Sequence, residues 1–232
     1  MPRGCAPSLR WEWYWLLRRL TYACALFSLV FLWGCPSWHE ILKPPAAENL
    51  PDDIPALIAL GDDLLKNRPS VTKARLALAA YEKAINRDVH DPNLTWRAAK
   101  ACVFLADNAE SKDEKLSIVD RGIAYAKAGV AMAPESVENN YYLGLNLGIK
   151  ANSMLLGALK LIPEIVKALK KSIELDESYD NAGALRTLGM VYAKAPSWPA
   201  SIGDTEEAVI LTSRAVELFP DEPLNRLFLG EA

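Results

Sequence analysis

An all-α solenoid of stacked helical hairpins, following an N-terminal export or anchor segment, is the fold class that the sequence predicts. From Ala56 onward the chain is rich in Ala, Leu, Lys and Glu and has no long alternation of apolar and polar residues, which favours helices over strands. Small residues recur, since Ala84, Gly129, Ser172 and Ala215 are separated by 45, 43 and 43 residues. Such a period is typical of helical hairpins that bury their apolar faces by stacking.

Residues 1–34 predict a signal peptide or a membrane anchor. The segment holds four of the 26 basic and one of the 29 acidic residues, so it carries +3 and the rest of the chain carries −6. Leu20–Gly34 has fifteen uncharged residues after Arg18 and Arg19. A membrane-spanning helix needs about 20 apolar residues, so the run suits a signal peptide. An uncleaved signal anchor, with aromatic Trp11–Trp15 at the headgroup level, is an alternative, and a segment outside the membrane is a third.

The end of this apolar run, "LWGC", resembles the lipobox of bacterial lipoproteins. Leu32 and Gly34 precede Cys35 at the expected distances, whereas Trp33 departs from the pattern. The resemblance implies cleavage before Cys35 and lipidation of its sulfur. It also implies a periplasm-facing protein of the bacterial cell envelope that is held to the membrane by lipid.

Residues 35–55 predict a proline-rich spacer, because five prolines lie between Pro36 and Pro55 and each one lacks the backbone donor that a helix needs. Residues 56–232 then form the repeat domain. We expect about four hairpins and a capping helix.

The clearest repeat unit lies near the C-terminus. Its first helix carries Leu185, Leu188, Gly189 and Tyr192, and its second helix carries Ala208, Thr212, Ala215 and Pro220. These spacings resemble the tetratricopeptide repeat (TPR), with patterns W-x2-L-G-x2-Y and A-x3-F-x2-A-x4-P. The resemblance implies a right-handed superhelical solenoid, in which small residues let paired helices approach closely and proline ends the second helix.

The same spacings return earlier in the chain with more drift. First helices are marked by a small residue beside or near a large one, and second helices by small residues around a bulky one. The first-helix marks are Leu60-Gly61, Trp96 with Ala99, Leu143-Gly144 and, in the cap, Leu229-Gly230. The second-helix marks are Ala77, Tyr81 and Ala84; Gly122, Ala126, Gly129 and Pro134; and Ile165, Leu169 and Ser172.

Each unit is longer than the usual repeat of about 34 residues, and the extra length lies between its two helices. In the second unit the insertion Asp107–Lys115 is polar and predicts a solvated loop, and in the fourth Ala195–Asp204 predicts a turn. The third insertion, Ala151–Pro163, is apolar. Its residues Met154, Leu155, Leu156, Leu159, Leu161 and Ile162 either extend the hairpin core or line a cavity for a small hydrophobic ligand or a partner helix.

Enzymatic and nucleic-acid functions have little support in the residues. The two histidines, His39 and His90, lie in a spacer and a turn, and Cys102 is the one cysteine after Cys35. No set suited to a metal or a nucleophile is visible, and Cys102 fits a small core residue. The acidic body lacks the basic face that phosphate binding requires. We therefore expect no catalysis and no cofactor.

The export segment, the long hairpins, "LGMVYAKAPSW…GDTEEA" and "ELFPDEP" together resemble two relatives within the TPR superfamily. One is the T-component of TRAP (tripartite ATP-independent periplasmic) transporters, which implies a solute-binding protein as partner. The other is the group of regulators of microtubule dynamics. Both resemblances imply a scaffold for protein interaction, and Cys35 favours the bacterial branch.

In TPR proteins the first helices line a concave groove, and the residue after the tryptophan place usually faces it. That place falls at Arg97, Tyr141 and Arg186. The resemblance therefore predicts an exposed Tyr141, with Tyr142 in the core, and two arginines able to pair with a carboxylate or an acidic peptide. Alternatively, Arg97 and Arg186 pair with neighbouring acids on a solvated face.

Overall fold

The computed structural model describes residues 50–66, 69–154 and 157–232. The proposed leader, Cys35 and most of the spacer lie outside the described residues, as do Leu155 and Leu156. All described residues belong to one compact unit.

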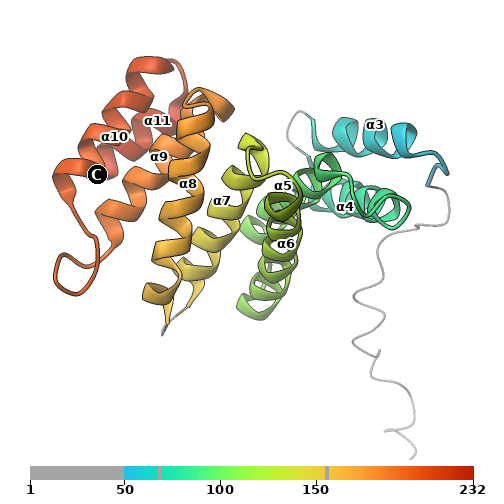
Figure 1. Ribbon diagram of the computed structural model, residues 1–232, viewed down its shortest axis with the longest axis horizontal. Helices are drawn as coiled ribbons and strands as arrows, with labels where there is room; N and C mark the ends of the chain where they lie inside the picture. The colour runs from blue at the N-terminus through green and yellow to red at the C-terminus, as the bar shows by residue number, and fades with distance from the viewer. Residues whose placement is uncertain (1–49, 67–68, 155–156) are drawn as a thin grey trace, which may run out of the picture. The chain divides into compact units, whose positions relative to one another are not determined.

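Within the described residues the chain forms four antiparallel helical hairpins and one further helix (Figure 1). The first helix of each hairpin packs against its second helix, and each hairpin packs against the next. This arrangement confirms the predicted all-α solenoid. The hairpins are α3 (Ile54–Leu65) with α4 (Val71–Ile85), α5 (Pro92–Asp107) with α6 (Lys112–Met132), α7 (Val137–Ser153) with α8 (Ile162–Leu175), and α9 (Tyr179–Lys194) with α10 (Thr205–Leu218), followed by α11 (Pro223–Glu231).

Short polar side chains begin most of these helices. Asp53, Ser70, Ser111 and Ser136 each accept a backbone N–H bond from the first turn of α3, α4, α6 and α7. Such caps satisfy donors that have no partner inside the helix. Because Asp53 is a cap, α3 begins at Ile54, two residues before the expected start of the repeat domain at residue 56.

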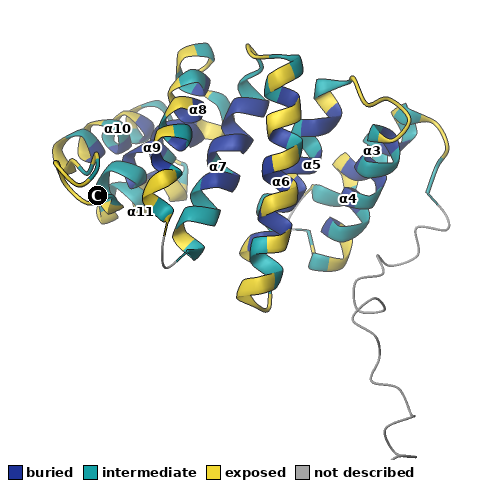
Figure 2. Ribbon diagram, turned by 60° about the horizontal axis from the view of Figure 1, so that its bottom comes forward, coloured by how far each residue is buried: buried dark blue, intermediate teal, exposed yellow. Residues whose placement is uncertain are grey.

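Close contact between the two helices of a hairpin explains the repeat signature. A Cβ added to Gly144 would lie 2.6 Å from Leu169 Cδ2, and one added to Gly189 would lie 2.7 Å from Thr212 Cγ2. Gly61 meets the ring of Tyr81 in the same way. The core runs along the middle of the array (Figure 2). Signature residues that it buries are Ala77, Tyr81, Ala84, Leu143, Leu188, Ala208 and Ala215.

The extra length of the units takes three different forms. In the second hairpin α6 begins at Lys112 and has 21 residues, so the expected solvated loop is wrong for Lys112–Lys115, which form its first turn. In the third, a short 3-10 helix, η2 (Ala158–Lys160), lies between α7 and α8. In the fourth, Ala195–Asp204 is a turn, as predicted. No described helix is both long enough and apolar enough to cross a membrane.

Candidate partner-binding face

Aromatic side chains from three first helices meet near the N-terminal ends of α5, α7 and α9. The rings of Trp96 and Tyr142 are stacked with centroids 6.1 Å apart, and Tyr141 lies 5.1 Å from Tyr142. Tyr179 meets Tyr141 edge-on at 5.4 Å. Offset and edge-to-face rings attract one another beyond their buried area. Trp96 and Tyr179 remain partly exposed, whereas Tyr141 and Tyr142 are buried. We call these four residues the aromatic cluster.

Arg97 borders the aromatic cluster on the side of the first hairpin. Its guanidinium lies 4.3 Å from the centroid of the Trp96 ring, and its Nε donates a 3.0 Å hydrogen bond to Asp62 Oδ1. The Tyr81 hydroxyl donates to the same carboxylate oxygen at 2.7 Å. Burial and the Asp62 carboxylate raise the pKa of Tyr81 above its ordinary value. Arg97 is thus paired with a neighbouring acid, and 19% of its side chain is exposed.

Tyr141 does not face solvent, so the expectation that it is exposed is wrong. Its relative exposure is 2%, and its hydroxyl donates a 2.5 Å hydrogen bond to Asp180 Oδ2 in the fourth hairpin. The place after the tryptophan position is therefore covered by the next hairpin. Burial raises the pKa of Tyr141 and Tyr142 well above their ordinary value, and it raises the pKa of the Tyr179 hydroxyl to about 12.

Arg186 is also buried, with 7% exposure, and is not available to an incoming carboxylate. Its Nη2 donates to Asp180 Oδ2 at 3.0 Å, and its Nη1 donates to the backbone oxygens of Asp180 and Asn181, each at 3.0 Å. Arg186 thus pairs with an acid, as the alternative expects, but its side chain is buried and does not lie on a solvated face. Arg186 therefore links the backbone and a side chain of the residues at the start of α9 by hydrogen bonds.

The backbone at the start of α9 forms a left-handed turn, and Arg186 stabilises it. Asp180, Asn181 and Ala182 have φ values of 51°, 53° and 63°, a conformation that costs energy for any residue with a Cβ. Asn225 of α11 donates a 3.1 Å bond to the Asn181 oxygen. Sequence reasoning missed Asp180 and Asn225. The adjacent Asp180 and Asn181 were an available signal for this turn, because aspartate and asparagine are second only to glycine in tolerating left-handed backbone.

The apolar insertion does not form one common wall in the part of it that is described. Ile162 is buried at 8% exposure and begins α8, Met154 is partly buried, and Leu159 is 47% exposed. Leu161 packs against the main core. Ile162 and Leu161 thus fit the interpretation that the insertion extends the hairpin core, and Leu159 does not.

The aromatic cluster and its border consist of aromatic rings and one paired arginine. Both arginines carry acidic partners, so the face offers the partly exposed residues Trp96 and Tyr179 and the paired Arg97 rather than free cations. Cys102 is buried, and burial raises its thiol pKa to about 12, which suits a core residue rather than a nucleophile. Within residues 50–66, 69–154 and 157–232, no group of His, Cys, Asp and Glu side chains is placed to hold a metal ion.

Two solved structures share this fold. A thermophilic TPR protein of Thermus thermophilus, TTC0263, aligns with a TM-score of 0.58 and 18% identity over 80% of this chain and 84% of its own. The MamA protein aligns with a TM-score of 0.52 and 18% identity over 76% of this chain and 79% of its own. These likenesses show the TPR fold.

The sequence itself matches one family model. The model described as "Regulator of microtubule dynamics protein 1-3" matches residues 57–189, which cover α4 to α8 with most of α3 and α9. It corresponds to one of the two relatives that the sequence resembles. No curated protein matches the chain.

Proposed function

We infer the function from one premise, which is that the chain belongs to the family of Regulator of microtubule dynamics proteins 1-3. We propose that it is a non-catalytic scaffold and that a protein partner binds across α5, α7 and α9. The partly exposed edges of the aromatic cluster and Arg97 make the contact.

One observation carries the proposal. Trp96 and Tyr179 are partly exposed residues although their rings pack against buried Tyr141 and Tyr142. Aromatic and arginine side chains dominate binding energy at protein interfaces when their geometry is already fixed. Here the stacking fixes Trp96, and Asp62 together with the Trp96 ring fixes Arg97. A partner therefore meets rigid anchors and orders few side chains on binding.

The paired state of Arg97 defines which partner chemistry fits. An acidic residue of a partner would have to share the guanidinium with Asp62, whereas an apolar or aromatic residue packs on the ring edges without displacing anything. We therefore expect an extended or helical segment whose central contact is apolar, with a hydrogen-bond acceptor for the exposed part of Arg97. The name of the family concerns microtubule dynamics, and photo-crosslinking identifies the partner without presupposing it.

The test places a photo-crosslinking benzoylphenylalanine at Tyr179 of the full chain, with the same amino acid at exposed Lys167 on α8 as the control. A partner crosslinked from position 179 and not from 167 is identified and purified. Its affinity is then measured for the wild type, for Arg97→Ala and for Arg121→Ala, a matched change at an arginine of α6 paired with Glu82. We expect Arg97→Ala to weaken binding at least tenfold and Arg121→Ala to leave it unchanged. Equal crosslinking from both positions, or equal affinities, would contradict the proposal.

We also propose that the scaffold is tethered to a membrane of the bacterial cell envelope. This proposal rests on the basic and apolar residues of Met1–Gly34 and on the lipobox-like "LWGC". The decisive measurement is the intact mass of the membrane-extracted protein together with its N-terminal peptide. A chain that begins at an acylated Cys35 supports a lipoprotein, a chain that retains Met1 supports a signal anchor, and a chain recovered without membranes rejects both.

A further inference from the structure

A buried polar contact joins α5, α6 and α7 beside the aromatic cluster. Thr95 of α5 and Asn139 of α7 are 3% and 0% exposed. The Thr95 hydroxyl shares its proton between Asn139 Oδ1 at 2.9 Å and the Pro92 oxygen at 2.8 Å, and Asn139 Nδ2 donates to the same Pro92 oxygen at 3.1 Å. A Cβ added to Gly129 of α6 would overlap Asn139 Oδ1. We call Thr95, Gly129 and Asn139 the first polar layer.

The same arrangement returns two helical turns away. Asn146 of α7 is 0% exposed, and its Nδ2 donates to the Ala99 oxygen of α5 at 3.2 Å. A Cβ added to Gly122 of α6 would overlap Asn146 Oδ1. Asn146 follows Asn139 by seven residues, and Gly122 precedes Gly129 by seven, which is about 10 Å along a helix. We call Ala99, Gly122 and Asn146 the second polar layer.

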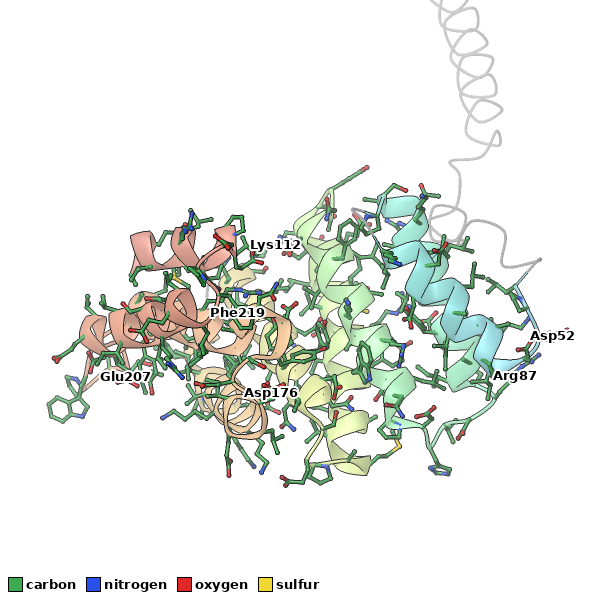
Figure 3. All side chains as sticks on the ribbon, turned by 90° about the horizontal axis from the view of Figure 1, so that it is seen from above. Asp52, Arg87, Lys112, Asp176, Glu207 and Phe219 are labelled. Carbon is green, nitrogen blue, oxygen red and sulfur yellow. The ribbon has the colours of Figure 1, made fainter. Side chains whose placement is uncertain are left out.

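Buried amides differ from the other polar contacts between helices. The ion pair of Asp52 with Arg87 lies at the surface, and Figure 3 shows both residues at the end of the array that holds the first hairpin. Such exposed pairs contribute little. A buried hydrogen bond has a preferred distance and direction, and leaving its partner unpaired costs free energy. The two polar layers are thus suited to fixing the position of α7 on α5 and α6.

The first polar layer lies next to the aromatic cluster. Thr95 directly precedes Trp96, and Asn139 precedes Tyr142 by three residues, which is nearly one helical turn. The rings of Trp96 and Tyr142 are stacked with centroids 6.1 Å apart, one from α5 and one from α7. The stack therefore depends on the relative position of the two helices that the Thr95–Asn139 bond joins.

We propose that Asn139 is a positioning residue for the partner-binding face, and that it acts through Thr95 by holding the Trp96 ring in its stack with Tyr142. The inference rests on the proposed function, in which Trp96 is a rigid anchor for a partner. Asn139 is buried and does not touch the partner itself. A ring already held in one arrangement need not be ordered on binding, so its fixed geometry favours affinity.

Asn139→Ala and Asn146→Ala form a matched comparison. Both residues lie on α7, are 0% exposed, face a glycine of α6 and donate to a backbone oxygen of α5. The affinity for the partner crosslinked from position 179 is measured at a temperature at which circular dichroism shows each variant to be folded. We expect Asn139→Ala to weaken binding by roughly fivefold or more, because the released ring must be ordered again. Asn146→Ala is expected to leave the affinity unchanged.

A second measurement needs no partner. The full chain in non-ionic micelles is labelled with 5-fluorotryptophan, and the fluorine resonance of Trp96 is assigned by its loss in Trp96→Phe. Asn139→Ala is expected to move this resonance toward its value in urea, because the ring leaves its stack, whereas Asn146→Ala is expected to leave it in place. The resonance of Trp198, which is 85% exposed, serves as the internal reference.

Thr95→Val tests the bond without opening a cavity. Valine has the shape of threonine but no proton to donate to Asn139 Oδ1, so it should reproduce both effects of Asn139→Ala, whereas Thr95→Ser keeps the hydroxyl and should not. Equal effects of Asn139→Ala and Asn146→Ala, or an unmoved Trp96 resonance in Thr95→Val, would overturn the proposal. If the wild type crosslinks no partner, the proposed function fails, and the Trp96 resonance alone decides whether Asn139 holds the ring.

Discussion

The Tyr141 hydroxyl donates a 2.5 Å hydrogen bond to Asp180 Oδ2, and this bond joins the third hairpin to the left-handed turn that opens the fourth. Asp180 also receives Arg186 Nη2 at 3.0 Å. A buried phenol and a buried guanidinium therefore share one carboxylate at the junction of two repeats. The left-handed backbone at this junction costs free energy, and the charge-assisted hydrogen bonds to Asp180 offset that cost.

Tyr141→Phe removes that donor and keeps the ring in the aromatic cluster. We expect the free energy of unfolding to fall by about 1 kcal/mol, because water reaches the partly exposed Asp180 and replaces part of the lost bond. Urea denaturation followed by circular dichroism measures the change. Tyr192→Phe is the control, since the Tyr192 hydroxyl makes no hydrogen bond within the described chain and its ring lies 5.9 Å from Lys170 Nζ. Equal losses in both variants would show that the bond to Asp180 contributes nothing specific.

Two glycines of α7 are expected to respond to alanine in opposite directions. Gly144 lies against Leu169, 2.6 Å from where the new Cβ would be, so Gly144→Ala should destabilise the protein by about 1–3 kcal/mol through overpacking. Gly148 has open space beside it, so Gly148→Ala should stabilise by about 0.5–1 kcal/mol, because alanine loses less backbone entropy in a helix. Thermal melts of both variants provide the measurement, and a loss of stability in Gly148→Ala would contradict the described packing.

The sequence predicts the hairpins because their signals are local and repeated. Leu188-Gly189 and Ala208 occur at spacings that only a close helix pair requires, and both are buried where they are expected. The start of α6 at Lys112 was missed because polar residues suit a solvated loop and an exposed helical turn equally well. The repeat period predicts where each helix pair lies, but it does not predict how the insertion between the two helices is folded.

The burial of Tyr141 and Arg186 was missed from the sequence for a different reason. Both residues occupy a groove-facing place in the repeat pattern, but here each is covered by a side chain about 40 residues later in the sequence. That cover depends on the left-handed backbone of Asp180–Ala182, which has no periodic signal. Arg97, which lies next to a regular helix start, remains partly exposed as predicted.

Arg186→Met tests how much the left-handed turn depends on its arginine. The change leaves the backbone oxygens of Asp180 and Asn181 without their charged donor, so we expect a loss of about 2–4 kcal/mol. Arg97→Met is the matched control, because its carboxylate partner is half exposed and its loss is expected to stay below about 1 kcal/mol. Amide hydrogen exchange should accelerate at residues 181–183 in the first variant only. Unchanged exchange there would show that the turn holds without Arg186.

We expect alkaline pH to destabilise the folded domain by ionising its buried tyrosines. Burial holds the pKa of Tyr179 at about 12 and that of Tyr141 well above the ordinary 10.0. A group whose folded pKa is raised keeps its proton longer in the folded state than in the unfolded state. The unfolded chain therefore binds fewer protons above about pH 10, and the free energy of unfolding falls as pH rises.

The stability that Tyr179 contributes is fully present below pH 10 and is lost through the window up to about pH 12, where Tyr179 ionises in the folded protein, while the loss from Tyr141 continues to higher pH. The urea midpoint should be flat from pH 7 to 9 and should fall between pH 10 and 12. Tyr141→Phe should make this fall shallower, because phenylalanine has no proton to lose in either state. A midpoint that stays level to pH 12, or an equally steep fall in the variant, would mean that Tyr141 is not buried as described.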